Sequence, residues 1–163
     1  MKENNIFDFV GFLAGLGCGL VAGVFFAFST FVMKALGKLP PAQGLAAMQS
    51  INEVVINPWF LTLFLGTAVT SACMVIASLL RWHDPRALYW LAGGVLYLGG
   101  TILVTAVFNV PRNNALAQVA PGSPEAAGFW AAYLSIWTAW NHVRTVAALL
   151  AGGAFTVAFR LRP

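Results

Sequence analysis

Residues 59–80 read WFLTLFLGTAVTSACMVIASLL, an unbroken run of uncharged and mostly apolar residues. A helix needs about 20 apolar residues to cross the hydrocarbon core of a bilayer, so this run predicts a membrane-spanning helix. Three further runs of that length lie on either side of it, at residues 9–33, 87–110 and 137–159. The sequence therefore predicts an all-α, integral membrane four-helix bundle that occupies residues 1–163 as a single domain.

The composition excludes a water-soluble domain. Of the 163 residues, 60% are hydrophobic and 9% are charged, and the mean hydropathy is +0.79. Soluble domains carry about 25% charged residues. The net charge of +4 is spread along the chain, so we expect membrane lipid and no nucleic acid as a partner. Cys18 and Cys73 lie alone in apolar runs, without the spacing of a metal or redox motif.

Two stretches outside the predicted spans combine helical spacing of apolar residues with polar residues between them. They cover residues 42–56 and 123–136, and Ser123 occupies the cap position of the second. Pro111 is expected to close the third spanning helix. We expect both stretches to form short amphipathic helices on the extracytoplasmic side, where they lie on the membrane surface or cap the bundle.

Lysine and arginine residues predict the orientation in the membrane, because they are enriched in cytoplasmic loops. Five of them lie with the termini and the turn between the second and third spans, and four lie on the opposite side. The first group is Lys2, Arg81, Arg86, Arg160 and Arg162, and the second is Lys34, Lys38, Arg112 and Arg144. We expect both termini in the cytoplasm and the protein in a bacterial inner membrane.

Small residues recur at every fourth position of the first span, at Gly11, Gly15, Gly19 and Gly23. Such a row lets another helix backbone approach closely. The row is favoured as a packing face within the bundle, and the alternative is an interface of a homo-oligomer. The glycines of the third span, Gly93, Gly94, Gly99 and Gly100, are expected to supply a facing surface.

Polar residues converge on one membrane face from three separate parts of the chain. They lie at residues 52–57, at 109–114 (NVPRNN) and at 141–145 (NHVRT). Aromatic residues form a predicted rim around them: Phe25, Phe28, Trp59, Phe60, Trp137 and Trp140. Apolar walls with a few polar groups are typical of a pocket for a small, flat, hydrophobic ligand. Taken singly, each polar residue has a structural explanation, such as capping a helix or reaching lipid headgroups.

Several stretches resemble the anthrone oxygenase family of small four-helix membrane proteins. They are residues 26–29 (FAFS), 48–58 (MQSINEVVINP), 109–114 with Leu116, and 137–145 (WTAWNHVRT). The resemblance implies oxidation of an anthrone to an anthraquinone with dioxygen. It puts forward these residues as the site: Asn109, Pro111, Asn113, Trp140, Asn141, His142 and Arg144. Arg112 and Asn114 depart from the family pattern. This departure bears on the identity of the substrate more than on the fold.

Three functions remain open from the sequence. In the first, a membrane oxygenase uses His142 as the base, while Arg144 and the asparagine amides stabilise an enolate oxyanion. In the second, a ligand-binding or electron-transfer protein holds haem through His142, so the cofactor is either none or haem. In the third, the protein interacts with lipid and has no chemistry. A non-haem metal site is not expected, because no carboxylate accompanies His142 at helical spacing.

Overall fold

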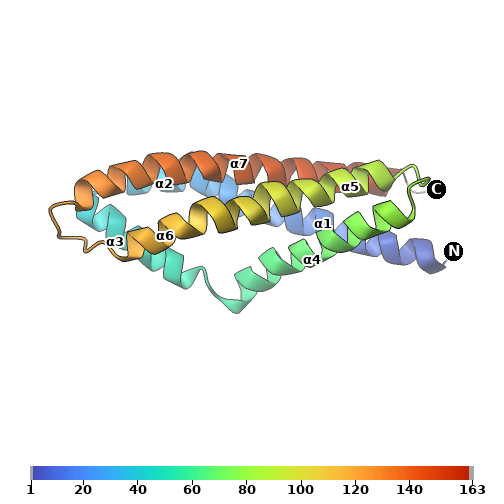
Figure 1. Ribbon diagram of the computed structural model, residues 1–163, viewed down its shortest axis with the longest axis horizontal. Helices are drawn as coiled ribbons and strands as arrows, with labels where there is room; N and C mark the ends of the chain where they lie inside the picture. The colour runs from blue at the N-terminus through green and yellow to red at the C-terminus, as the bar shows by residue number, and fades with distance from the viewer. Residues whose placement is uncertain (1, 162–163) are drawn as a thin grey trace.

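The computed structural model describes the backbone of residues 2–161 and the side chains of residues 6–161, and these residues form helices without strands. Helical rods run side by side along the long axis, and the first and last described residues lie at the same end of the bundle (Figure 1). Each rod is long and apolar enough to cross a membrane: Ile6–Leu36, Pro58–Leu80, Ala87–Ala117 and Ala126–Arg160. The predicted all-α membrane bundle is confirmed.

Two of the rods contain π-helical segments, which are wider than an α-helix. The first rod consists of α1 (Lys2–Ala27), the π-helix η1 (Phe28–Val32) and α2 (Met33–Leu36). The third consists of α5 (Ala87–Val95), the π-helices η2 (Leu96–Leu103) and η3 (Thr105–Asn109), and α6 (Val110–Ala117). The second rod is α4 (Pro58–Leu80) and the fourth is α7 (Ala126–Arg160). The helix α3 (Pro41–Val54) comes between the first and second rods in the chain.

The third rod continues through Pro111, so the prediction that this proline closes the helix is wrong. Pro111 lies in the first turn of α6, directly after η3. A proline is tolerated in a first turn because the backbone N–H that it lacks has no partner there. The rod therefore changes its winding at Pro111 and carries Asn113 onward along the bundle.

The fourth rod is one helix of 35 residues, α7. The prediction of a separate amphipathic helix at residues 123–136 is therefore wrong, because α7 runs without a break from Ala126 through the expected junction at Trp137. No proline or glycine interrupts the chain between Phe129 and Ala151. At 1.5 Å per residue α7 is about 52 Å long, and it exceeds the hydrocarbon core of about 30 Å.

The other predicted amphipathic helix is confirmed as α3, which is followed by a sharp elbow into α4. Asn57 caps α4, because its Oδ1 accepts a hydrogen bond from the backbone N–H of Phe60 at 3.0 Å. Pro58 occupies the first turn of α4, as its position in the sequence predicts. The elbow projects away from the rest of the bundle (Figure 1).

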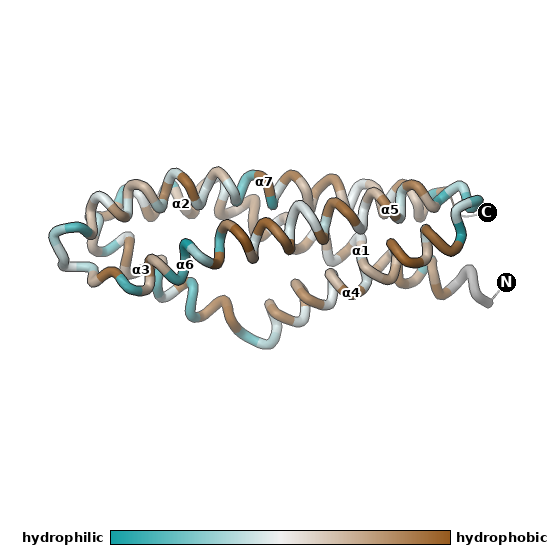
Figure 2. Tube along the Cα trace, viewed as in Figure 1, coloured by the Kyte–Doolittle hydropathy of each residue, from teal (hydrophilic) through white to brown (hydrophobic). Residues whose placement is uncertain are grey.

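Two hydrophobic clusters fill the bundle, one behind the other along its axis. The first joins α1, α4, α5, η2 and α7 around Phe25, Phe64, Tyr97 and Phe155. The second joins α2, α3, α6 and α7 around Met48, Leu116, Trp130 and Trp137. Figure 2 shows hydrophobic residues along the rods and hydrophilic residues at both ends of the bundle, along α3 and at the start of α6. The long α7 is the element that runs through both clusters.

The glycine row of the first span divides between two environments. A Cβ added at Gly11 or Gly15 would contact Met74 or Phe155, so these two glycines pack within the bundle. A Cβ at Gly19 or Gly23 would meet nothing within 4 Å, so the expectation of a crowded face at Gly19 is wrong. The helix turns about 100° per residue, and a row at every fourth position drifts around it. An oligomer through this row stays a prediction.

The glycine of α1 with the least space for a side chain is Gly17, which is not part of the row at every fourth position. A Cβ at Gly17 would overlap the side chain of Thr67 on α4. In the third rod, a Cβ added at Gly99 would meet nothing within 4 Å. A Cβ added at Gly93, Gly94 or Gly100 would overlap the side chain of Phe155, Val75 or Ala147, respectively. These glycines therefore face α4 and α7, and the expected facing surface for the first-span row is not formed.

An ion-pair cluster joins α1 to the turn between α4 and α5. The Arg86 guanidinium lies 2.6 Å from Asp8 Oδ1 and 2.7 Å from Asp84 Oδ2, and its side chain is 3% exposed. Its hydrogen bonds hold the pKa of Asp84 below the usual value, and Asp84 in turn raises the pKa of Arg86. Arg86 is one of the five basic residues from which the orientation in the membrane was predicted. Of these five, Lys2 and Arg162 have side chains outside the described residues.

Candidate functional site

A layer of polar side chains lies between the two hydrophobic clusters, and Asn141 on α7 is at its centre. Asn141 is fully buried, and its Nδ2 donates to the carbonyl oxygen of Phe25 at 2.7 Å and to Ser29 Oγ at 2.8 Å. Thr145 donates to the backbone carbonyl of Asn141 and is bonded to Ser29 at 3.1 Å. These bonds tie the first rod to the fourth in the middle of the bundle.

Arg144 is the only arginine or lysine within this layer, among the described residues. Its side chain points into the bundle, with the whole residue 4% exposed, and its Nη2 donates to Asn141 Oδ1 at 2.7 Å. Nη1 donates to Thr105 Oγ1 at 3.2 Å. The guanidinium carbon lies 4.2 Å from the centre of the Phe25 ring and 5.0 Å from that of Trp137. Arg144 thus contacts one aromatic ring from each hydrophobic cluster.

Among the side chains of residues 6–161, no carboxylate forms an ion pair with Arg144. Its Nε is buried and has no hydrogen-bond partner. A buried charge without a partner is costly, so intramembrane ionisable residues usually carry a function. The arrangement leaves a donor and a positive charge available to an anionic or strongly accepting group.

The π-helical segments supply the partners of this layer. Ser29 comes from η1, Thr101 from η2, and Thr105 and Asn109 from η3. Each contacts α7: Thr101 Oγ1 donates to the carbonyl of Arg144 at 3.4 Å, and Asn109 Nδ2 donates to the carbonyl of Trp137 at 3.3 Å. Single π-helical turns inside α-helices occur frequently at functional sites. Their presence on both rods opposite α7 supports this layer as the site.

Asn113 extends the layer toward the second hydrophobic cluster. Its Oδ1 accepts hydrogen bonds from the Tyr133 hydroxyl and from Trp137 Nε1, both at 2.8 Å. The ring of Trp137 is therefore fixed from two sides, by Asn113 at its edge and by the guanidinium of Arg144 at its face. The structure thus brings together four of the five polar residues predicted from the sequence: Asn109, Asn113, Asn141 and Arg144.

His142 is the predicted site residue that the structure does not place in this layer. It is exposed on α7, whereas its neighbour Asn141 is fully buried. Adjacent residues on a helix are about 100° apart, so Asn141 and Arg144 share the inner face and His142 turns outward. The sequence-based placement of His142 beside Arg144 is wrong. A haem bound through His142 would therefore lie on the outer face of α7.

The predicted aromatic rim is formed in part. Phe25 and Trp137 line the site, and Phe28 packs on Trp137 with the ring centres 5.7 Å apart. Trp59 is 86% exposed on the elbow, so its assignment to the pocket wall is wrong: the elbow turns the first residues of α4 away from the bundle. Phe60 stacks on Phe64, and Trp140 stacks on Phe108 instead of on the polar layer.

Sequence reasoning missed Thr101, Thr105 and Tyr133. The first two precede Asn109 at intervals of four residues, which puts all three on one face of a helix. That spacing was the available signal in the third span. Tyr133 was hidden by the expectation that residues 123–136 form a separate helix. Thr145, which the polar clustering placed on this membrane face, and Ser29, which ends the FAFS stretch, do take part.

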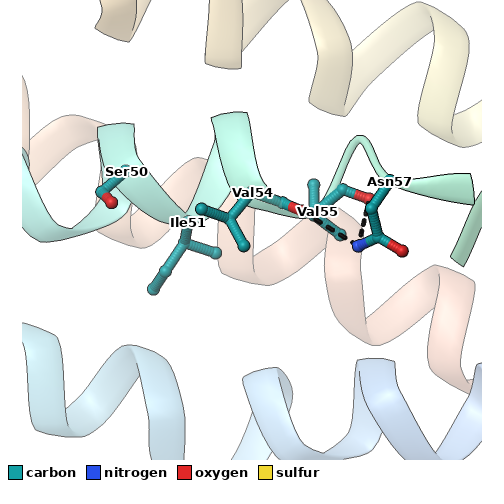
Figure 3. A pocket seen from close by; sticks show the side chains of 5 residues that line it. All are labelled: Ser50, Ile51, Val54, Val55 and Asn57. Atoms are coloured by element: carbon teal, nitrogen blue, oxygen red, sulfur yellow. Dashed lines mark hydrogen bonds between the residues drawn. The ribbon is translucent and has the colours of Figure 1, made fainter. Parts of the chain in front are cut away.

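A shallow, open pocket lies at the elbow between α3 and α4. It has a volume of about 330 Å³ and is lined by Ser50, Ile51, Val54, Val55 and Asn57 (Figure 3). Ile51 also packs against the hydrophobic cluster that contains Trp137. The pocket therefore shares a wall with the cluster that borders Arg144. Within the described part of the chain, no three His, Cys, Asp or Glu side chains gather to hold a metal ion.

Comparison with known proteins gives one match. Residues 59–154, which make up more than half of the chain, match the family model described as anthrone oxygenase. No curated protein and no solved structure matches the chain. The matched region contains Asn109, Asn113, Trp137, Asn141 and Arg144, whereas Phe25 and Ser29 precede it.

Proposed function

The chain belongs to the anthrone oxygenase family, and we propose that it is a membrane oxygenase that oxidises a small hydrophobic aromatic substrate of the anthrone or phenol type with dioxygen. In such a reaction the methylene carbon of an anthrone becomes a carbonyl. Two C–H bonds break, one oxygen atom of dioxygen stays on the carbon, and the other leaves with both hydrogens as water. The anthrone is oxidised and dioxygen is reduced.

The observation that carries this proposal is the buried guanidinium of Arg144 without a carboxylate partner. An anthrone reacts with dioxygen after it loses a proton to a water molecule, because the resulting anthrolate passes an electron to dioxygen readily. Arg144 offers its unpaired Nε and its charge to the oxygen of that anion. Donors that are fixed in advance in a dry site stabilise a developing oxyanion more than water does. We therefore assign Arg144 the stabilisation of the anthrolate.

Aromatic side chains beside Arg144 suit the rings of such a substrate. Phe25 and Trp137 already lie against the guanidinium, and a planar ligand would contact the same faces. We propose that the substrate reaches the site from the membrane through the pocket at the elbow, past Ile51. The exposed side chains of Val54, Ile56 and Trp59 make this elbow apolar, as a passage from lipid requires.

The proposal gives His142 a smaller role than the sequence suggested. Its side chain faces away from Arg144, so it does not reach a substrate oxygen bound there. His142→Ala therefore serves as the matched control, because it changes the adjacent residue of the same helix and keeps the buried layer intact.

Formation of the quinone from an anthrone under air tests the proposal. The purified protein in detergent is mixed with anthrone, and anthraquinone absorbance is followed against a control without protein. We expect the wild type and His142→Ala to accelerate the reaction, and Arg144→Gln to lose about a hundredfold in rate, as removal of one oxyanion donor does. Arg144→Lys should also fail, because a lysine cannot reproduce the planar, multiple contacts of a guanidinium.

Two outcomes would overturn this assignment. If no variant, including the wild type, exceeds the control without protein, the oxygenase function is wrong, and a ligand-binding protein without catalysis becomes the better description. If His142→Ala loses activity while Arg144→Gln keeps it, the reaction occurs on the exposed face of α7 and not in the buried layer.

A further inference from the structure

Two buried polar atoms in the layer have no hydrogen-bond partner, and their chemistry is complementary. Asn109 Oδ1 can only accept a hydrogen bond, and Arg144 Nε can only donate one. The two residues are 1% and 4% exposed. Leaving such a buried atom unpaired costs free energy, and native structures leave few of them. One unpaired acceptor and one unpaired donor in the same layer indicate that a bound group forms hydrogen bonds with both atoms.

Their contacts place these two residues around the same part of α7. Asn109 Nδ2 donates to the carbonyl of Trp137, and the Arg144 guanidinium lies over the Trp137 ring. Thr105, one turn before Asn109 on η3, accepts a hydrogen bond from Arg144 Nη1 at 3.2 Å. Asn109 and Arg144 therefore border one region, with an aromatic face beside it.

A hydroxyl group matches this pair, because it both donates and accepts. We propose that Asn109 and Arg144 together bind one hydroxyl of an aromatic ligand: its proton is donated to Asn109 Oδ1, and its oxygen accepts from Arg144 Nε. This inference rests on the proposed function and specifies the substrate class as a phenol or an enol. An ether or a ketone oxygen can accept from Arg144 but leaves Asn109 Oδ1 unpaired. Asn109 is thus a specificity-determining residue.

A pair of ligands in which a methyl group replaces the hydroxyl proton tests this inference. Binding of 1-naphthol and of 1-methoxynaphthalene is measured by titration calorimetry under argon, with protein-free micelles as the blank for partition into detergent. We expect the wild type to bind the naphthol about tenfold more tightly, the usual effect of one buried hydrogen bond. Asn109→Leu should bind both ligands equally, because the acceptor is gone.

Asn114→Leu is the matched control, since Asn114 is exposed on α6 and lies outside the layer. It should keep the tenfold preference. Equal binding of the two ligands by the wild type would overturn the inference, and this comparison decides the matter even if Asn109→Leu does not fold. A preference that survives in a folded Asn109→Leu would also overturn it, because the hydroxyl would then be held elsewhere and Asn109 Oδ1 would be satisfied by water alone.

The argon titration separates this inference from the oxygenase function. Without dioxygen the measurement reports binding only. If the wild type forms quinone under air but does not prefer the naphthol, the role of Asn109 is wrong and the oxygenase function stands. If it prefers the naphthol through Asn109 but never forms quinone, the hydroxyl site stands and the oxygenase function is wrong.

Discussion

Arg144 and Asn141, one turn apart on α7, are joined by a hydrogen bond of 2.7 Å between Nη2 and Oδ1. The amide of Asn141 is bonded on its other side to Phe25 and Ser29 of the first rod. The asparagine therefore orients the guanidinium and links it to the far wall of the site. A change at Asn141 should affect both the position of Arg144 and the packing of two rods.

We predict that Asn141→Ala destabilises the protein by about 1–3 kcal/mol, because it leaves Arg144 Nη2, the Phe25 carbonyl and Ser29 with unpaired buried groups. The melting temperature in detergent measures the effect. Asn114→Ala, a change at an exposed asparagine, should stay within about 0.5 kcal/mol of the wild type. Equal melting of the two variants would show that the bonds of Asn141 contribute nothing to stability.

Two glycines of α1 should respond in opposite ways to the same substitution. Gly17→Leu would overlap Thr67, so we expect a loss of about 1–3 kcal/mol from overpacking. Gly19→Leu faces open space and should be close to neutral in a monomer. Thermal melting in detergent compares them. Strong destabilisation by Gly19→Leu, together with a change in molecular mass, would indicate that this face packs against a second copy.

The ion-pair cluster at Arg86 should make stability depend on acid pH. The pKa of Asp84 is lower in the folded protein than its usual value of 3.8, so the ionised form stabilises the fold above that value. Stability should fall as the pH drops through the lowered pKa. We predict that Asp84→Asn removes this part of the loss between about pH 5 and pH 2. An unchanged pH profile in the variant would show that other carboxylates are responsible.

Labelling of single cysteines in intact cells tests the proposed orientation. Gly122 lies in the loop before α7, and His83 lies in the turn between α4 and α5, at the end of the bundle that holds both termini. With both termini in the cytoplasm, an impermeant thiol reagent should modify Gly122→Cys from outside and leave His83→Cys unmodified. The reverse pattern would place the termini outside. The background is the variant in which Cys18 and Cys73 are replaced by serine.

The sequence predicted the fold well because the bilayer imposes a simple requirement. Apolar runs of spanning length define the rods, and the starts at Pro58 and Ala87 are close to those of the predicted runs. The ends of the third and fourth rods could not be predicted in this way. Both rods are longer than the predicted runs, and at the end that holds the second hydrophobic cluster Leu116 and Trp130 pack against α3. That contact depends on tertiary structure, which hydropathy does not report.

The sequence predicted that the polar residues of the candidate site lie close together, but it did not predict every helix face on which they lie. Asn141 and Arg144 are three residues apart, so helix geometry alone places them together. The same geometry turns His142 away from the interior of the bundle. His142 was predicted as a site residue because imidazole is a suitable base, and its position on the helix was given too little weight. The π-helical segments shift the inward face of the first and third rods, and no sequence pattern announced them. Ser29 and Thr105, which contact α7, lie in these segments.

The ionisation of a bound anthrone measures the central claim most directly, because Arg144 is assigned the stabilisation of its anion. Anthrone is added to the protein in detergent under argon at neutral pH, so that oxidation cannot occur, and the visible absorbance of the anthrolate is recorded. We predict that the anthrolate band appears with the wild type and with His142→Ala, and that it is absent with Arg144→Gln. An anthrolate band of equal strength with Arg144→Gln, or none with the wild type at saturating anthrone, would contradict the account.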